Sequence, residues 1–311
     1  MNSNGLLDIK QKLIRVHNPF LKAFIQFALP GLFSVFESFY INNKIKWNGK
    51  RGCFLLSFDC DFPEDVFVLP EIVDILAKNK IKGSFACVGR WVNDYPDEHR
   101  VLIDNGFEII NHTYSHPELI NSKKFKSVRD DLNPRKWEEL SLNEKEKEII
   151  LCNEVVLKKL GHKINGFRAP HFGLIKMENI YPILEKEKFI YSSSTTSINS
   201  SSLGFPFHIG KTLEIPLTNC IKHPFSVFDT WHSFYARGGW HRNNFLNIFE
   251  ELLKRCHSKC LLINVYLDPK DIRHFDLTKM VEIISAHKEN IWMPTLSEFT
   301  LWFRSNLCKI E

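Results

Sequence analysis

The sequence has no pair of cysteines at the C-x-x-C spacing of a zinc ribbon. Its eight cysteines are scattered along 311 residues, and only Cys256 and Cys260 are close neighbours. This excludes a paired-cysteine zinc framework and the disulfide scaffold of a small secreted domain. Scattered thiols in a chain of this length are typical of proteins from a reducing compartment.

The first residues lack the basic start, compact apolar core and cleavage site of a signal peptide, so we expect a cytoplasmic protein. The chain also lacks a clean apolar run of membrane-spanning length. Residues 19–41 are rich in Phe and Leu, but Lys22, Pro30 and Glu37 interrupt them. Two interpretations stay open: an ordinary packed cap, or an amphipathic helix that touches the inner face of a membrane.

Neither sign of charge dominates, since the net charge is +5 and basic residues are interleaved with nearly as many acidic ones. No basic run with interleaved aromatics is present, so nucleic acid is not an expected partner. No repeat with a period of 20–50 residues is present either, which excludes a solenoid. The apolar fraction of 44% is that of a globular protein.

What the sequence does contain is an alternation of short β-rich runs with helix-like stretches. The expected strands lie at Cys53–Phe58, Gly83–Val88, Phe107–Ile110, Ile164–Arg168, Ile190–Ser193, Leu213–Leu217, Leu261–Leu267 and Ile291–Thr295. Ser141 and Glu144 form a capping box that opens a helix ending near Gly161. This order predicts an α/β fold with a mainly parallel sheet closed into a barrel, rather than two small domains.

Three polar clusters follow expected strands, where parallel α/β folds place their active sites. Asp59 and Asp61 follow the first strand, His112 and His116 follow the third, and Arg168 ends the fourth. An Asp and two His leave coordination positions open, as in a catalytic metal site. The second Asp could take a proton from water whose pKa the metal lowers, and a nearby Arg would keep that Asp ionised.

The segments SFDCD, NHTYSHP and GFRAPHF together resemble the first three motifs of the polysaccharide deacetylases, carbohydrate esterase family four. The resemblance runs from about Gly52 to Phe303. It implies a distorted (β/α) barrel of about seven strands over residues 51–305. Residues 1–50 would form an apolar and aromatic N-terminal extension.

The resemblance also implies roles for the clustered residues. Asp59 falls on the general base, His112 and His116 on metal ligands, and Arg168 on the residue that tethers the base. Asp61 is the third ligand in the Asp-x-Asp variant of the motif, with Cys60 as the alternative. One divalent ion is implied, with Zn²⁺ favoured by this donor set and nickel, cobalt or iron as alternatives.

The chain departs from the family where a late strand usually ends in Leu-His-Pro. Here Asp268 stands in place of the His that protonates the leaving amine. A carboxyl group needs a pKa raised by burial to act as an acid near neutrality. Either Asp268 is this catalytic acid, His274 or another residue substitutes for it, or activity is impaired.

Aromatic and polar residues near the motifs are candidates for sugar binding, because aromatic rings stack on sugar faces. These candidates are Pro170, His171, Phe172, Trp231 and Trp240. The expected function is metal-dependent removal of an N-acetyl or N-formyl group from an amino sugar or polysaccharide precursor, which could be lipid-linked. The alternatives are a cyclic-amide or ureide hydrolase and a carbohydrate-binding pseudo-enzyme.

Overall fold

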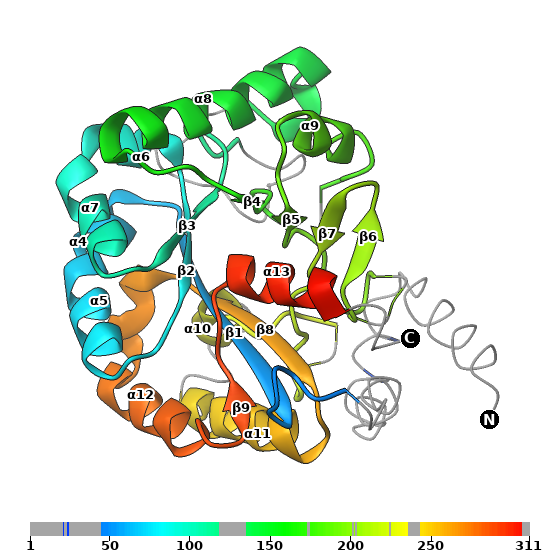
Figure 1. Cartoon of the computed structure of the whole chain (residues 1–311). Coiled ribbons are helices and arrows are strands. Elements are labelled where there is room, and N and C mark those ends of the chain that lie inside the picture. Colours follow the sequence, from blue (N-terminus) through cyan, green and yellow to red (C-terminus); the bar gives the residue numbers. More distant parts are fainter. Residues whose placement is uncertain are drawn as a thin grey trace.

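The computed structural model describes residues 45–117, 135–172, 175–200, 202, 204–223, 225–235 and 243–306, together with Leu21 and Phe24. Within these residues a curled sheet is ringed by helices (Figure 1). The strands are β1 (Gly52–Cys60), β2 (Ser84–Cys87), β3 (Glu108–Asn111), β4 (Gly166–Phe167), β5 (Tyr191–Ser192), β6 (Phe207–Ile209), β7 (Thr212–Glu214), β8 (Leu262–Leu267) and β9 (Ile291–Trp292).

The helices in the described part of the chain follow the strands in the expected alternation. They are α4 (Pro63–Phe67), α5 (Leu69–Lys78), α6 (Gly89–Asp94), α7 (Pro96–Asp104), α8 (Leu142–Leu160), α9 (Tyr181–Lys186), α10 (Thr230–Phe234), α11 (Phe245–Ser258), α12 (Leu277–Ala286) and α13 (Leu296–Asn306), with the 3-10 helices η2 (Trp137–Glu139) and η4 (Pro269–His274).

The sheet runs in the order β6-β7-β5-β4-β3-β2-β1-β8, and β9 also pairs with β1. The pairings are parallel except the β6–β7 hairpin. The predicted α/β fold is confirmed, in the form of a half-barrel. Each of the eight expected strand segments contains a strand, and β6 is an addition. It is a short, partly exposed strand that turns into β7 through Gly210, at φ 57°.

The central strand β1 is buried along its whole length, as expected for a parallel strand covered on both faces. Because side chains alternate between faces, Phe54 and Phe58 pack under the outer helices. Cys53 and Leu55 face the inner side, where α13 lies across the sheet (Figure 1). Trp47 joins this inner cluster, so the barrel packing already includes a residue of the segment 1–50.

The long helix α8 begins and ends as its sequence predicts. The hydroxyl of Ser141 accepts from the backbone N–H of Glu144, and the Glu144 carboxylate accepts from the Ser141 N–H, which completes the capping box. Gly161 ends the helix in the left-handed conformation at φ 66°. The helix packs against β3 and α6, which brings its inner face to the carboxyl end of the sheet.

Asn264 of β8 bridges the open side of the half-barrel. Its amide Nδ2 donates to the carbonyls of Ile215 and Pro216, at 3.1 and 3.3 Å, and to Ser193 Oγ at 3.0 Å. The Asn264 carbonyl accepts from the backbone N–H of Thr218 at 2.8 Å. One buried side chain therefore links β8 to the segment that follows β7.

Among the residues that the structure describes, no helix combines the length and apolar character needed to cross a bilayer. Apart from Leu21 and Phe24, the segment 19–41 lies outside the described residues. Its proposed membrane contact therefore stays a prediction.

We predict that Asn264→Ala lowers the free energy of unfolding by about 1–3 kcal/mol, because two buried carbonyls lose their donor. Urea denaturation followed by circular dichroism measures the loss. Asn105→Ala is the matched control, since the Asn105 amide also donates to a backbone carbonyl but at an exposed position. Equal effects of the two changes would show that Asn264 does not hold the half-barrel together.

Candidate active site

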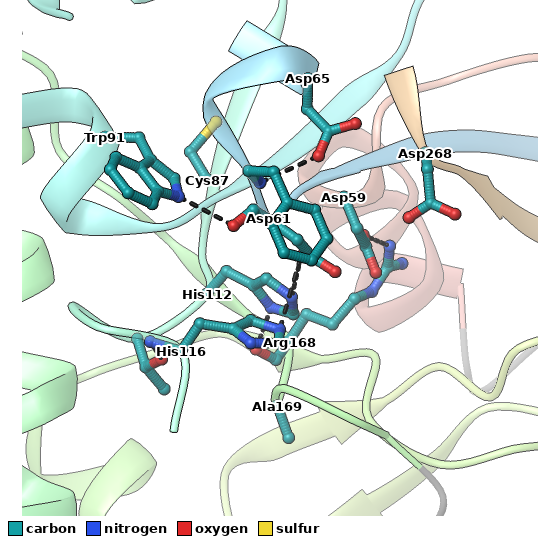
Figure 2. A network of polar contacts seen from close by, with 12 residues as sticks. Asp59, Asp61, Asp65, Cys87, Trp91, His112, His116, Arg168, Ala169 and Asp268 are labelled. Atoms are coloured by element: carbon teal, nitrogen blue, oxygen red, sulfur yellow. Dashed lines mark hydrogen bonds and ion pairs between the residues drawn. The ribbon is translucent and has the colours of Figure 1, made fainter. Parts of the chain in front are cut away.

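The polar clusters predicted from the sequence meet at the carboxyl end of the parallel strands. Asp59 and Asp61 stand at the end of β1, His112 follows β3, Arg168 follows β4, and Asp268 follows β8. Figure 2 shows these side chains converging from their separate strands. The convergence follows from the topology, since parallel neighbouring strands all end at one edge.

Arg168 is a fully buried cation whose partners come from several strands. Its Nη1 donates to Asp59 Oδ1 at 2.5 Å and to Ser57 Oγ at 2.9 Å. Its Nε and Nη2 donate to the carbonyl and hydroxyl of Ser193, both at 3.2 Å. The guanidinium therefore fixes the position of the Asp59 carboxylate.

The pKa of Asp59 is nevertheless raised. Burial raises it, and the neighbouring Arg168 and His112 offset only part of that effect. Arg168 thus favours the ionised form of Asp59, as expected, while burial works against it. A cation bound nearby would lower the pKa again, because it adds positive charge beside the carboxylate.

Asp61, His112 and His116 form a group with metal-ligand geometry. Asp61 Oδ1 lies 3.1 Å from His112 Nε2 and 3.5 Å from His116 Nε2. Ligand atoms at ~2.0–2.1 Å from a tetrahedral ion lie about 3.3 Å apart, so these spacings suit one shared ion. Cys60, the alternative ligand, packs in the hydrophobic cluster under the outer helices.

The hydrogen bonding of this group also fits a cation. His112 Nδ1 lies 2.8 Å from the carbonyl of Arg168, so Nδ1 carries a proton and Nε2 is the ring nitrogen directed at Asp61. Burial lowers the pKa of His116 to about 3, so this imidazole is neutral. The Asp61 carboxylate and the two Nε2 atoms therefore face one another around a point where positive charge is favoured, either as a proton on His112 or as a bound cation.

The charges around the group agree with this conclusion. Burial lowers the pKa of His112, but the carboxylates of Asp61 and Asp59 outweigh it and raise that pKa. Burial likewise raises the pKa of Asp61, yet His116 and His112 hold it below its ordinary value. The site therefore favours an ionised carboxylate with a positive partner, which a divalent cation would supply.

The loop that carries both histidines is held from α8. Glu148 accepts from the backbone N–H groups of Tyr114 and Ser115, at 3.1 and 2.8 Å. Thr113 and His116 have φ values of 63° and 50°, conformations that cost energy for residues other than glycine. The helix thus stabilises a strained turn that directs His116 toward Asp61. Glu148 was not predicted from the sequence, where it is one of many charged residues in its neighbourhood.

Asp268 has the surroundings that a carboxylic acid needs to stay protonated. It is 5% exposed, and burial raises its pKa while Lys270, whose Nζ lies 3.9 Å away, offsets only part of the shift. Thr230 Oγ1 donates to Asp268 Oδ2 at 3.0 Å and accepts from the Asp268 N–H at 2.8 Å. Figure 2 shows Asp268 on the far side of Asp59 from the two histidines.

A second carboxylate, Asp65, lies under this part of the site. It accepts from the backbone N–H groups of Phe62 and Lys270, both at 2.9 Å, and so ties the loop after β1 to the loop after β8. Burial raises the pKa of Asp65 to about 7. The indole N–H of Trp91 donates to the Asp61 carbonyl at 2.8 Å, and this hydrogen bond also holds the segment after β1 in place. Neither Asp65 nor Trp91 was singled out from the sequence.

The candidate substrate residues have different surroundings. His171 lies against His116, with ring centroids 4.8 Å apart, and Phe172 packs edge-on against Tyr266 at 4.7 Å. Pro170 is buried and Trp231 is 41% exposed. His274 Nε2 lies 3.0 Å from the hydroxyl of Tyr235. Trp240 lies outside the described residues.

Comparison with known proteins shows which family part of this chain resembles. Residues 46–188 match the sequence model of the family described as polysaccharide deacetylase. Over these residues, a little under half of the chain, the sequence is similar to the polysaccharide deacetylase family. The match includes every predicted ligand, the proposed base Asp59 and Arg168. Asp268 lies beyond it.

Two curated relatives of this chain carry substrate names. The peptidoglycan-N-acetylmuramic acid deacetylase PdaA of Bacillus subtilis is 27% identical over 170 residues, which is 55% of this chain and 54% of the relative. A chitooligosaccharide deacetylase of Sinorhizobium fredii is 39% identical over 64 residues, which is 21% of this chain and 29% of the relative. The chain thus spans about half the length of these relatives or less.

A solved structure from Mycobacterium smegmatis, assigned as a polysaccharide deacetylase, shares the fold. It superposes with a TM-score of 0.67 at 16% identity and covers 85% of this chain and 94% of its own. At this identity the likeness shows the arrangement of strands and helices alone. The likeness therefore says nothing about the reaction, which depends on the residues that this chain carries.

We predict that Glu148→Ala weakens Zn²⁺ binding about 10–100-fold, because the strained histidine turn loses its anchor. Competition with a fluorescent chelator measures the dissociation constant. Glu154→Ala is the matched control, since Glu154 lies on the same helix but is exposed. Unchanged affinity in Glu148→Ala would mean that the turn holds its shape without α8.

Proposed function

We propose that this protein hydrolyses an N-acyl amide, acetyl or formyl, on an amino sugar or polysaccharide precursor. The observation that carries the proposal is the convergence of Asp61, His112 and His116 beside the buried Asp59–Arg168 pair. The names of the two relatives support an N-acylated sugar as the substrate, since one is a chitooligosaccharide deacetylase and the other a peptidoglycan-N-acetylmuramic acid deacetylase.

In this proposal Asp61, His112 and His116 hold one divalent cation, Zn²⁺ by their donor set. When bound, the cation would lower the pKa of water and polarise the acyl carbonyl. His112 is held for this task by the Arg168 carbonyl, which fixes its tautomer and leaves Nε2 for the ion.

Asp59 would act as the general base. Its Oδ1 is held by Arg168, so the carboxylate cannot rotate away from the site. Burial raises its pKa, which makes the ionised group a stronger base than an exposed aspartate. After this step Asp59 would hold the proton that it takes from water.

Asp268 would protonate the leaving amine in place of the usual His. Burial raises its pKa, so it remains protonated to a higher pH than an exposed aspartate. His171 is less suited, because burial lowers its pKa to about 4 and leaves it neutral near pH 7. A neutral imidazole has no acidic proton strong enough for this step.

The remaining assignments belong to the same proposal. Trp231 and Phe172 would contact the sugar, together with Pro170, His171 and Trp240. The barrel of residues 51–305 would carry the chemistry. Residues 19–41, within the N-terminal extension of residues 1–50, would bring the protein to the inner face of a membrane, where a lipid-linked sugar would be accessible.

The test is release of acetate and formate from a panel of N-acyl amino sugars by the metal-loaded protein. We expect turnover on at least one sugar, and we expect Asp59→Asn to abolish it while the metal content stays at the wild-type level. Asp74→Asn is the control, since Asp74 is an exposed carboxylate paired with Lys78. Loss of metal together with activity in Asp59→Asn would make Asp59 a ligand rather than the base.

Two outcomes of this panel would overturn the proposal. Turnover on cyclic amides or ureides, with none on sugars, would identify the ureide hydrolase alternative. Binding of sugars without turnover, at full metal content, would identify a pseudo-enzyme in which Asp268 does not replace the missing His.

For the acid, we predict that Asp268→Asn lowers kcat about 10²–10⁴-fold, because an amide cannot give up a proton to the departing nitrogen. Asp268→His should retain more activity than Asp268→Asn, since imidazolium is an acid of suitable strength. Steady-state kinetics measure both variants, with metal content and melting temperature as controls. Full activity in Asp268→Asn would leave Asp268 as a loop residue hydrogen-bonded to Thr230.

A further inference from the structure

A second group of side chains with metal-ligand character lies outside the active site described above. Cys220, His223 and His232 are all buried, and their ligand atoms lie within 4.8 Å of one another. No C-x-x-C pair marks this group in the sequence, because it combines a single Cys with two His. No role in the proposed reaction uses these three residues.

The backbone around the group is a tight turn followed by a helix. Asn219 and Val227 pair as an antiparallel bridge, and the N–H of Cys220 donates to Ser226 O at 2.7 Å. The N–H of His223 donates to Cys220 O at 3.1 Å, which closes the C-x-x-H turn. Helix α10 begins two residues after Phe228 and carries His232 back to the turn.

The donor atoms are spaced as one ion requires. His232 Nε2 lies 3.2 Å from His223 Nδ1. Two nitrogens at ~2.0–2.1 Å from a tetrahedral ion lie about 3.3 Å apart. The buried thiol of Cys220 completes the group, with its sulfur within 4.8 Å of both imidazole donors. A cysteine binds a metal as its thiolate, so the ion would displace the thiol proton.

We propose that Cys220, His223 and His232 form a second metal centre that binds one Zn²⁺ ion. One thiolate and two imidazoles are ligands that zinc takes in proteins, and the thiolate favours it over magnesium or calcium. The described residues supply three ligands, which leaves the fourth position open. On binding, the Cys220 thiol gives its proton to solvent, and the ion takes its place on sulfur.

The simpler interpretation is a hydrogen bond between two neutral histidines with a thiol nearby. That interpretation accounts for the 3.2 Å contact of the imidazoles. It does not account for the thiol in the same group, whose sulfur lies within 4.8 Å of both imidazole donors. A metal ion explains the grouping of all three side chains at once.

The proposed centre would stabilise the side of the active site that holds Asp268. His232 lies in α10, two residues after Thr230, whose hydroxyl exchanges hydrogen bonds with Asp268. An ion that joins the turn at Cys220 to α10 would therefore fix the start of this helix. The second ion would hold this helix in position, and the proposed reaction would not pass through it.

Substitution with Co²⁺ in the full chain tests the proposal, because cobalt bound to a thiolate has a near-ultraviolet charge-transfer band. We expect two ions per chain and this band in the unaltered protein. Cys220→Ser and His232→Gln should each lose one ion and the band. His112→Asn should lose the other ion and keep the band, which separates this centre from the proposed active site.

Two cysteine variants serve as controls. Cys256→Ser removes an equally buried thiol of α11, and Cys60→Ser removes the thiol between Asp59 and Asp61. Both should keep the band. Loss of the band in Cys60→Ser with retention in Cys220→Ser would overturn the proposal and place sulfur in the active site.

X-ray absorption of the unaltered zinc protein gives a second measurement that does not depend on the folding of any variant. We expect a sulfur scatterer at ~2.3 Å from zinc in part of the metal population. One ion per chain without a sulfur scatterer would overturn the proposal. Neither result depends on whether the protein deacetylates a sugar.

Discussion

The buried charge of Arg168 is the constraint on which the rest of the site depends. An unpaired guanidinium in this position would be prohibitively costly, so its donors must all find acceptors. Asp59, Ser57 and Ser193 provide them from β1 and from the end of β5. The same residue offers its carbonyl to His112. One side chain thereby fixes the proposed base, and its backbone fixes the orientation of a proposed metal ligand.

This network also joins the site to the closure of the fold. The hydroxyl of Ser193 accepts from Arg168 and from the amide of Asn264, the residue that bridges the open side of the half-barrel. A shift of β8 relative to β5 would therefore disturb Arg168 and, through it, Asp59. Because Asp268 follows β8 directly, the proposed acid and base are positioned by the same sheet.

The sequence predicted the parts of the fold that depend on local pattern. The apolar run of β1, the capping box at Ser141 and the glycine end at Gly161 are short-range signals, and the structure contains each of them. The convergence of the polar clusters followed from parallel strands that end at one edge. The roles of Glu148 and Asn264 could not be predicted, because their partners lie more than 30 residues away. Nothing local marks such contacts.

The surroundings of Asp268 explain how an aspartate could act as an acid at a position where relatives carry a histidine. An exposed aspartate would be ionised near neutrality and could only accept a proton. Burial and the nearby carboxylate of Asp271 raise the pKa of Asp268, and Lys270 counteracts them only in part. The acidity of the residue is therefore a property of the loops after β1 and β8, which Asp65 ties together through Lys270. If Asp268 is the acid, its function requires this burial, and the segments after β1 and β8 both contribute to it.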